Sequence, residues 1–249
     1  MEKFRLFKIN AFLKVDFTEE EDLWLKSGYT LRKLVGILGM GLPVLLYVFL
    51  FVSTGHKGPL DSICHYYFTR VASIFIIILG TIGIFLLVYK GKKSVDFYIS
   101  FIAGIFALLV LLFPTSNISD ICNDADKKYS VTILSQSDFR EDFHYISAAI
   151  FLLCLSFMSL CLFTKSDKPK DKRGRRKIIR NRIYRTCGVI MVLSLLIILL
   201  GTFNIIPTVF YKQYHITYWM ETLAIESFGF SWLIKGDTLF KDRFKKALS

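Results

Sequence analysis

The residues best suited to chemistry in this chain are its four histidines and the acids near them. They are His56, His65, His144 and His215. His65 follows Asp61 by four residues and precedes an apolar run, while His144 and His215 each open one. Glu221 comes six residues after His215, about 9 Å further along a helix. Imidazole and carboxylate groups together could exchange protons with a substrate or bind a zinc-like metal.

The spacing of these groups matches no known metal or cofactor motif. The sequence contains no HExxH and no CxxC, and it lacks a nucleophile elbow, a P-loop and a dinucleotide fingerprint. We therefore expect no metal site, and no cofactor is indicated. Histidines at a membrane surface often only hydrogen-bond the backbone or lipid head groups, so a structural role stays open for each of them.

Two glutamates lie inside the last apolar run, ITYWMETLAIESFGFSWLI. A carboxylate at membrane depth costs about 2.5 kcal/mol or more, so it normally faces the protein interior and has a partner there. We expect Glu221 to face the interior and to meet His144 or Tyr66. Glu226 is five residues further on and points elsewhere, and a structural hydrogen bond is the favoured role for it.

A second group of polar and aromatic residues precedes the second apolar run, in the stretch DSICHYYFTR. Its ordinary role would be an aromatic belt at the membrane interface, and contact with a lipid head group or a glycan is the functional alternative. Glu221 and His144 are the candidate catalytic residues. The candidate substrate contacts are Asp61, Ser62, His65, Tyr66, Tyr67 and His215.

Six apolar runs must position these groups: Leu34–Val52, Val71–Tyr89, Phe97–Phe113, Tyr145–Phe163, Gly188–Ile206 and Ile216–Ile234. Each approaches the roughly 20 residues that cross a hydrocarbon core about 30 Å thick. Lipid offers no water to loose backbone groups, so each run should be helical. The sequence therefore predicts an all-α, polytopic membrane protein with six transmembrane helices. Glycines at positions 36, 39 and 41 favour close packing of the first helix.

The distribution of basic residues predicts the orientation of these helices. Of the 32 Lys and Arg residues, 26 lie on one side: seven up to Lys33, three in Lys90–Lys93, eleven in Lys165–Arg185 and five from Lys235. Cytoplasmic segments are enriched in Lys and Arg, so both termini should be cytoplasmic. Residues 1–33 then form an amphipathic cytoplasmic tail, residues 34–234 the transmembrane domain and residues 235–249 a basic cytoplasmic tail.

The formal net charge of +12 does not indicate nucleic-acid binding, because its distribution follows the membrane topology. The segment Lys165–Arg185 is expected to attract anionic lipid head groups. A regulatory docking site for a cytoplasmic partner is the alternative. On the other side, Cys64 and Cys122 could form a disulfide between the first two outer loops if that compartment is oxidising.

Several of these segments resemble a known family. DSICHYYFTR, LLFPT, HYISAAIF, RNRIYRTCG and WMETLAIESFGFSWLIKG are similar to segments of bacterial six-span membrane proteins. More broadly, they resemble the group that includes the damage-regulated autophagy modulators and the GPI-anchor remodelling factors. The resemblance covers most of residues 30–240 and implies a six-helix fold with a polar outer pocket and lipid involvement. The residues of this chain that match the family are Ser62, Tyr66, Tyr67, His144, Asn181 and Glu221. His65 and Glu226 are not part of this match.

Three classes of function follow. The first, favoured because the unusual polar groups gather at one depth, is a lipid-binding or lipid-modifying protein with a pocket facing the outer leaflet. The second is a proton-coupled transporter of small molecules that uses Glu221 and Glu226. The third is a non-catalytic scaffold or sensor. Whether the chain is an enzyme stays open, and its expected location is a cell membrane, the bacterial inner membrane first.

Overall fold

The computed structural model describes residues 28–91, 94–118, 129–166 and 174–236. Its helices are α2 (Gly28–Thr54), η2 (Ile63–Phe68), α3 (Ala72–Val88), α4 (Ser94–Leu112), α5 (Asp138–Phe157), η4 (Met158–Leu162), α6 (Arg175–Thr202), α7 (Thr208–Gln213) and α8 (Ile216–Lys235). Here η2 is a 3-10 helix, and η4 is a π-helical turn that continues α5. Within these ranges, β pairing is limited to one antiparallel bridge between Thr69 and Ser130. The all-α prediction is thus confirmed for the described residues.

Four helical stretches are long and apolar enough to cross a membrane: Thr30–Thr54, Ser94–Leu112, Asp138–Leu162 and Arg175–Thr202. They indicate a membrane protein with several spans. The other two apolar runs are also helical, but α3 has only 17 residues and α8 carries two glutamates. Six membrane crossings therefore stay a prediction.

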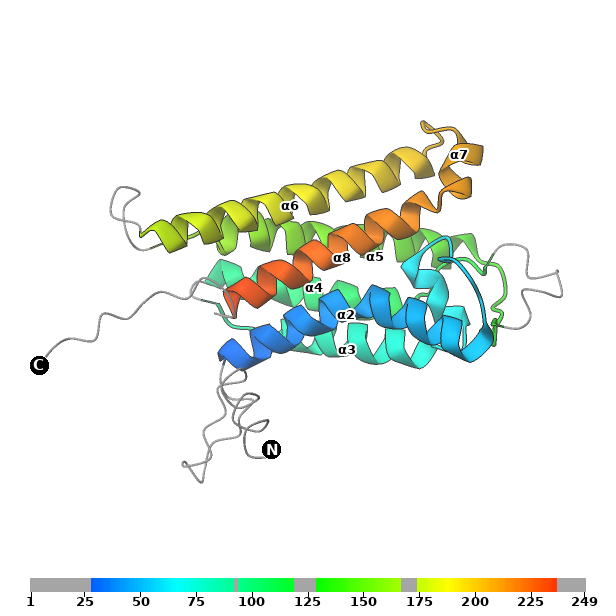
Figure 1. The fold of residues 1–249 in the computed structure, drawn as a ribbon, viewed down its shortest axis with the longest axis horizontal. Coiled ribbons are helices and arrows are strands. Elements are labelled where there is room, and N and C mark those ends of the chain that lie inside the picture. The colour runs from blue at the N-terminus through cyan, green and yellow to red at the C-terminus, as the bar shows by residue number, and fades with distance from the viewer. Residues whose placement is uncertain (1–27, 92–93, 119–128, 167–173, 237–249) are drawn as a thin grey trace, which may run out of the picture.

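The long helices run roughly parallel to one another (Figure 1). Contacts between neighbours close a ring in the order α2, α3, α4, α5, α6, α8 and back to α2. The start of α2, the start of α6 and the end of α8 lie at one end of this ring, and η2 and α7 lie at the other (Figure 1). The chain thus gathers the loop before α3, the start of α5 and the start of α8 at the end where α7 lies.

Glycines set the close packing of α2 against α8. A Cβ atom at Gly36 would lie 2.8 Å from the carbonyl oxygen of Gly229, and a Cβ at Gly229 would lie 2.7 Å from that of Gly36. Gly39 faces the same partner helix, with its would-be Cβ 3.2 Å from the Phe228 ring. Small residues let membrane helices approach this closely. The expected close approach of the first helix is therefore present at Gly36 and Gly39, whereas Gly41 meets only Leu45 of its own helix.

An aromatic cluster fills the ring at the end away from α7. The Trp232 ring of α8 is fully buried. It contacts the rings of Tyr89, Phe163, Phe85 and Phe228 at centroid distances of 5.0, 5.4, 5.5 and 5.9 Å. Edge-to-face contacts of this kind add to the stabilisation that comes from burial. This cluster holds α8 in place while its first turns carry the polar residues.

The structure changes two of the predicted boundaries. Arg175–Arg185, which the apolar runs leave in a loop before Gly188, forms the first turns of α6, and residues 28–33 belong to α2. Lys and Arg are good helix formers, so a strongly basic segment can continue a membrane helix into water. The rest of the predicted N-terminal tail, the basic tail after residue 236 and Cys122 lie outside the described residues, so the predicted disulfide stays a prediction.

Candidate functional site

A cavity of about 500 Å³ opens among the loop before α3, the loop before α5, and the adjoining ends of α5, α6, α7 and α8. Of the eight predicted site residues, those lining it are Asp61, Ser62, His65, His144, His215 and Glu221. They come from three segments that are far apart in the sequence. The structure thus brings six of the predicted residues to one cavity.

Glu221 is the centre of the polar wall of this cavity. Its Oε2 accepts hydrogen bonds from the Ser62 Oγ at 2.8 Å and from the backbone N–H of Ile63 at 2.6 Å, and its Oε1 lies 3.0 Å from the same Oγ. Ser62 in turn caps η2, because its Oγ accepts from the Cys64 N–H at 3.1 Å. Glu221 faces the interior, as expected, but its hydrogen-bond partners are Ser62 and Ile63 rather than His144 or Tyr66.

A second link joins the same loop to the start of α8. The His215 Nδ1 lies 2.9 Å from the Asp61 Oδ1, and the backbone carbonyl of Asp61 accepts from the Tyr218 N–H at 3.1 Å. His215 precedes α8 with φ 46°, a left-handed conformation that is uncommon for a residue other than glycine. The cost of this conformation is offset by tertiary contacts, of which the Asp61 link is one. Asp61 and Ser62 therefore dock the loop before α3 on two successive turns of α8.

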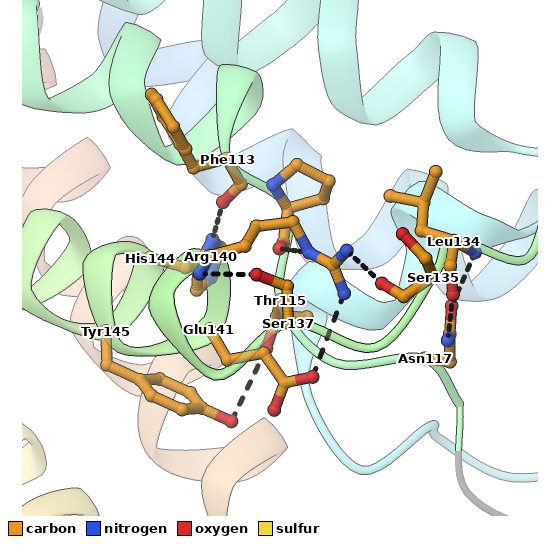
Figure 2. Close-up of polar contacts among 11 residues, drawn as sticks. Phe113, Thr115, Asn117, Leu134, Ser135, Ser137, Arg140, Glu141, His144 and Tyr145 are labelled. Atoms are coloured by element: carbon orange, nitrogen blue, oxygen red, sulfur yellow. Dashed lines mark hydrogen bonds and ion pairs between the residues drawn. The ribbon is translucent and has the colours of Figure 1, made fainter.

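His144 contributes from α5 on another side of the cavity. Its Nδ1 lies 2.7 Å from the backbone oxygen of Phe113, at the end of α4 (Figure 2). A carbonyl oxygen only accepts, so Nδ1 must carry the hydrogen. In the neutral ring, Nε2 is then an acceptor. The contact fixes the tautomer of His144 and ties the start of α5 to the end of α4.

Arg140, which sequence reasoning missed, organises the loop beside His144. Its guanidinium donates to the carbonyl oxygens of Pro114, at 3.1 Å, and Ser135, and it pairs with Glu141 at 3.7 Å (Figure 2). Asn117 and the Leu134 backbone exchange two hydrogen bonds of 2.8 and 3.0 Å in the same loop (Figure 2). These contacts hold Thr115, Ser116 and Asn117 against the cavity.

His65 lines the cavity with a buried ring. Both of its ring nitrogens are buried, and neither has a hydrogen-bond partner among the described residues. Burial lowers the pKa of His65 from 6.5 to about 4, an effect opposed by Asp61 and reinforced by His144. The ring is therefore neutral near pH 7, with one N–H donor and one acceptor nitrogen that make no hydrogen bond among the described residues.

Two predicted contacts, Tyr66 and Tyr67, do not line the cavity. Tyr66 is fully buried and packs against Tyr218, with the ring centroids 6.2 Å apart. Tyr67 packs edge-on against Phe68 at 5.3 Å. Both residues belong to η2, and their rings pack against neighbouring aromatic side chains. Their positions do not support the prediction that they contact a substrate in this cavity.

Another part of the cavity lining is apolar. It is formed by Ala148, Ala149 and Leu152 of α5 and by Leu195, Ile198 and Leu199 of α6. From His144 to Leu152 the wall follows α5 for eight residues, about 12 Å. The cavity is thus polar at the end of the helix ring and apolar where it continues between two helices that can cross a membrane.

Several further lining residues had no clear signal in the sequence: Thr115, Asn117, Tyr145, Tyr211 and Lys212. The break of the apolar run at Pro114 was the one hint that a polar turn follows α4. Tyr211 belongs to α7, and its hydroxyl lies 3.0 Å from the Thr217 Oγ1 of α8. This contact holds α7 over the cavity.

The remaining candidates lie away from this cavity. Glu226 lines a separate cavity of about 490 Å³ with Arg182 and Cys187, between α2, α6 and α8. Asn181 is buried, with no hydrogen-bond partner for its Oδ1 in the described ranges.

The cavity does not present a ready metal site. In the part of the chain that the structure describes, no three His, Cys, Asp or Glu side chains come close enough together to hold a metal ion. What the arrangement offers instead is the carboxyl group of Glu221 bound to the Ser62 hydroxyl, the imidazole rings of His65, His144 and His215, and apolar side chains of α5 and α6 in the same lining.

Comparison with known proteins leaves this site without an assigned role: no protein-family model, no curated protein and no solved structure matches the chain.

Proposed function

We propose that this chain is a six-span membrane protein, with both termini cytoplasmic, whose end cavity binds a membrane lipid from the outer leaflet. One observation carries the proposal: a single cavity has a polar wall around Glu221 and an apolar wall on α5 and α6. An amphiphile has the same division, with a polar head group and an acyl chain. Ligand sites generally combine such an apolar lining with a few placed polar groups.

The position of the apolar wall supports this ligand class. It lies on α5 and α6, two helices that are long and apolar enough to cross a membrane. An acyl chain on this wall would run parallel to the chains of the surrounding bilayer. The polar wall would then lie at the level of the head groups, where Asn117, His144 and Glu221 can meet polar atoms of a lipid.

The segment around α7 supports a lipid-facing location as well. Large apolar side chains are exposed there, including Val209 at 80% and Phe203 at 71%. Such exposure would be costly in water but is favourable at the boundary between head groups and acyl chains. Since α7 also lines the cavity, a lipid could pass from the outer leaflet to the cavity beside it.

The transporter alternative has less support from the geometry. It needs polar groups along a path across the membrane, and Glu221 and Glu226 line separate cavities. The scaffold alternative requires no cavity of this kind. Anionic lipid head groups remain the proposed partners of the basic segment Lys165–Arg185, and a bacterial inner membrane remains the proposed location.

The test fills the apolar wall with a bulky side chain. Ala149→Trp should exclude the acyl chain, while Leu153→Trp places the same indole on the exposed outer side of α5, where Leu153 is 49% exposed. Each protein is purified in nanodiscs and bound lipid is identified by native mass spectrometry. We expect the parent and Leu153→Trp to retain a lipid that Ala149→Trp loses. Equal lipid retention by all three proteins would contradict the proposal.

A further inference from the structure

The pair formed by Ser62 and Glu221 has a geometry that lipid binding alone does not require. We propose that the cavity is an acyl-transfer site for ester lipids, with Ser62 as the nucleophile and Glu221 as the base that receives its proton. The inference rests on the proposed function, because the apolar wall is what would present the ester to Ser62. It adds a reaction, a substrate class and a role for each residue.

The distance between the two side chains suits proton transfer. The Ser62 Oγ lies 2.8 Å from the Glu221 Oε2, within the hydrogen-bond reach that a general base needs. The Ile63 N–H holds the same carboxylate oxygen at 2.6 Å, so the base is fixed by the backbone. A serine hydroxyl is a weak nucleophile until an adjacent base is positioned in this way.

The Ser62 oxygen also retains a lone pair for attack. A hydroxyl oxygen has two lone pairs and one hydrogen. Its hydrogen is donated to Glu221, and one lone pair accepts the Cys64 N–H at 3.1 Å. The remaining lone pair is available to a carbonyl carbon in the cavity that Ser62 lines.

The reaction needs no group beyond the lipid and an acceptor hydroxyl. The Ser62 Oγ forms a bond to the ester carbonyl carbon while its proton moves to Glu221. Collapse of the tetrahedral intermediate breaks the bond between this carbon and the alcohol oxygen, and Glu221 returns the proton to the departing alcohol. Water, or the hydroxyl of a second lipid, then attacks the acyl carbon, and the bond from this carbon to the Ser62 oxygen breaks, which releases a fatty acid or a new ester. The proton of the attacking water or hydroxyl passes through Glu221 to the Ser62 oxygen, which restores the starting pair.

His65 supplies the group that such an intermediate requires. Negative charge develops on the carbonyl oxygen, and catalysis of this type depends on a donor placed to receive it. The neutral His65 ring lines the same cavity, and its buried nitrogens make no other hydrogen bond in the described residues. Its N–H has no hydrogen bond to give up among the described residues, and a turn of the ring towards the cavity would bring this N–H to the oxyanion.

A long-chain alkyl fluorophosphonate, which reacts with activated serines, tests the assignment on the full chain in nanodiscs. We expect one adduct, which peptide mass spectrometry places on Ser62. Ser62→Ala should abolish the adduct, and Glu221→Gln, which keeps the side-chain shape and one acceptor oxygen, should slow its formation by at least about 100-fold. Ser231→Ala is the matched control, because the hydroxyl of this buried α8 serine donates to the Phe228 carbonyl oxygen of its own helix, and its labelling should equal that of the parent.

Lipid retention, measured on the same samples, separates this inference from the proposed function. Retained lipid with no adduct on Ser62, or an adduct that forms equally fast in Glu221→Gln, would overturn the acyl-transfer inference and leave lipid binding standing. Loss of lipid from the parent would instead remove the proposed function. A melting temperature unchanged in Glu221→Gln confirms that a slower reaction does not reflect unfolding.

Discussion

Glu221 acts on the loop before α3 much as a capping side chain acts on a helix. Its carboxylate accepts the Ile63 N–H at the start of η2 and holds the capping residue Ser62 by its hydroxyl. The contact joins residues 158 and 159 positions apart, so one side chain fixes both the local turn and its place on α8.

The buried ring of His65 should make the stability of the protein depend on pH. Its folded pKa is about 4 against 6.5 for a free side chain, so the unfolded chain binds a proton first as the pH falls. The stability contributed by the neutral ring is present above about pH 6.5 and is lost as the pH falls towards 4. The charged or titratable groups that act on it are Asp61 and His144.

This dependence can be measured as melting temperature in nanodiscs between about pH 7.5 and about pH 5. The parent should lose more thermal stability over this interval than His65→Asn, which keeps a polar side chain that does not titrate. An equal loss in both proteins would show that other groups dominate the acid response.

Part of the site could be predicted from residue types, and part could not. A glutamate inside an apolar run has to face the interior, which singled out Glu221 correctly. Its partners could not be predicted, because Ser62 and Ile63 reach it through a loop whose docking depends on the packing of η2 against α8. That Tyr66 and Tyr67 pack beside η2 and do not line the cavity could not be predicted for a related reason. Tyrosine is equally suited to an interface and to a core, and only the fold distinguishes the two.

Among the helices, the contact of α2 with α8 offers the sharpest test of packing. A side chain at Gly36 would collide with backbone atoms of Gly229 and Leu233, which cannot move as a flexible side chain can. Gly36→Ala should therefore destabilise the protein by about 1–3 kcal/mol, the usual cost of overpacking. The measurement is thermal unfolding in detergent or nanodiscs.

Gly41→Ala is the control for this prediction. It adds the same methyl group five residues further along α2, where the nearest atom is a Leu45 methyl at 3.6 Å. Its melting temperature should equal or exceed that of the parent, since alanine favours a helix more than glycine does. Equal destabilisation by both substitutions would show that the close approach to α8 is not the cause.

Helix positions followed well from the apolar runs, but helix ends did not. Each run lies within a helix, or within a helix and its π-helical extension, apart from a few residues at the ends. The start of α6 was missed because Arg175–Arg185 was interpreted by its charge alone. Charge indicates which side of a membrane a segment occupies, whereas helix propensity and continuity with the following span determine its conformation.

For the molecule as a whole, the predicted topology places the cavity and the basic segment on opposite sides of the membrane. In a background without native cysteines, a cysteine at Ser135 should react with an impermeant reagent added outside intact cells. A cysteine at Lys170 should react only after the membrane is opened. Labelling of both positions from the same side would contradict the orientation and with it the outer-leaflet location of the cavity.

The length of α3 has a consequence for the surrounding bilayer. Its 17 residues extend about 26 Å, against about 40 Å for the 27 residues of α2 beside it. As a crossing helix, α3 would be shorter than a typical hydrocarbon core, and hydrophobic mismatch would draw the lipid inward along this flank. We expect the highest melting temperature in nanodiscs of short-chain phosphatidylcholine and a decrease as the acyl chains lengthen. The protein would then favour thin membranes, and local thinning would shorten the path by which lipids move between the leaflets.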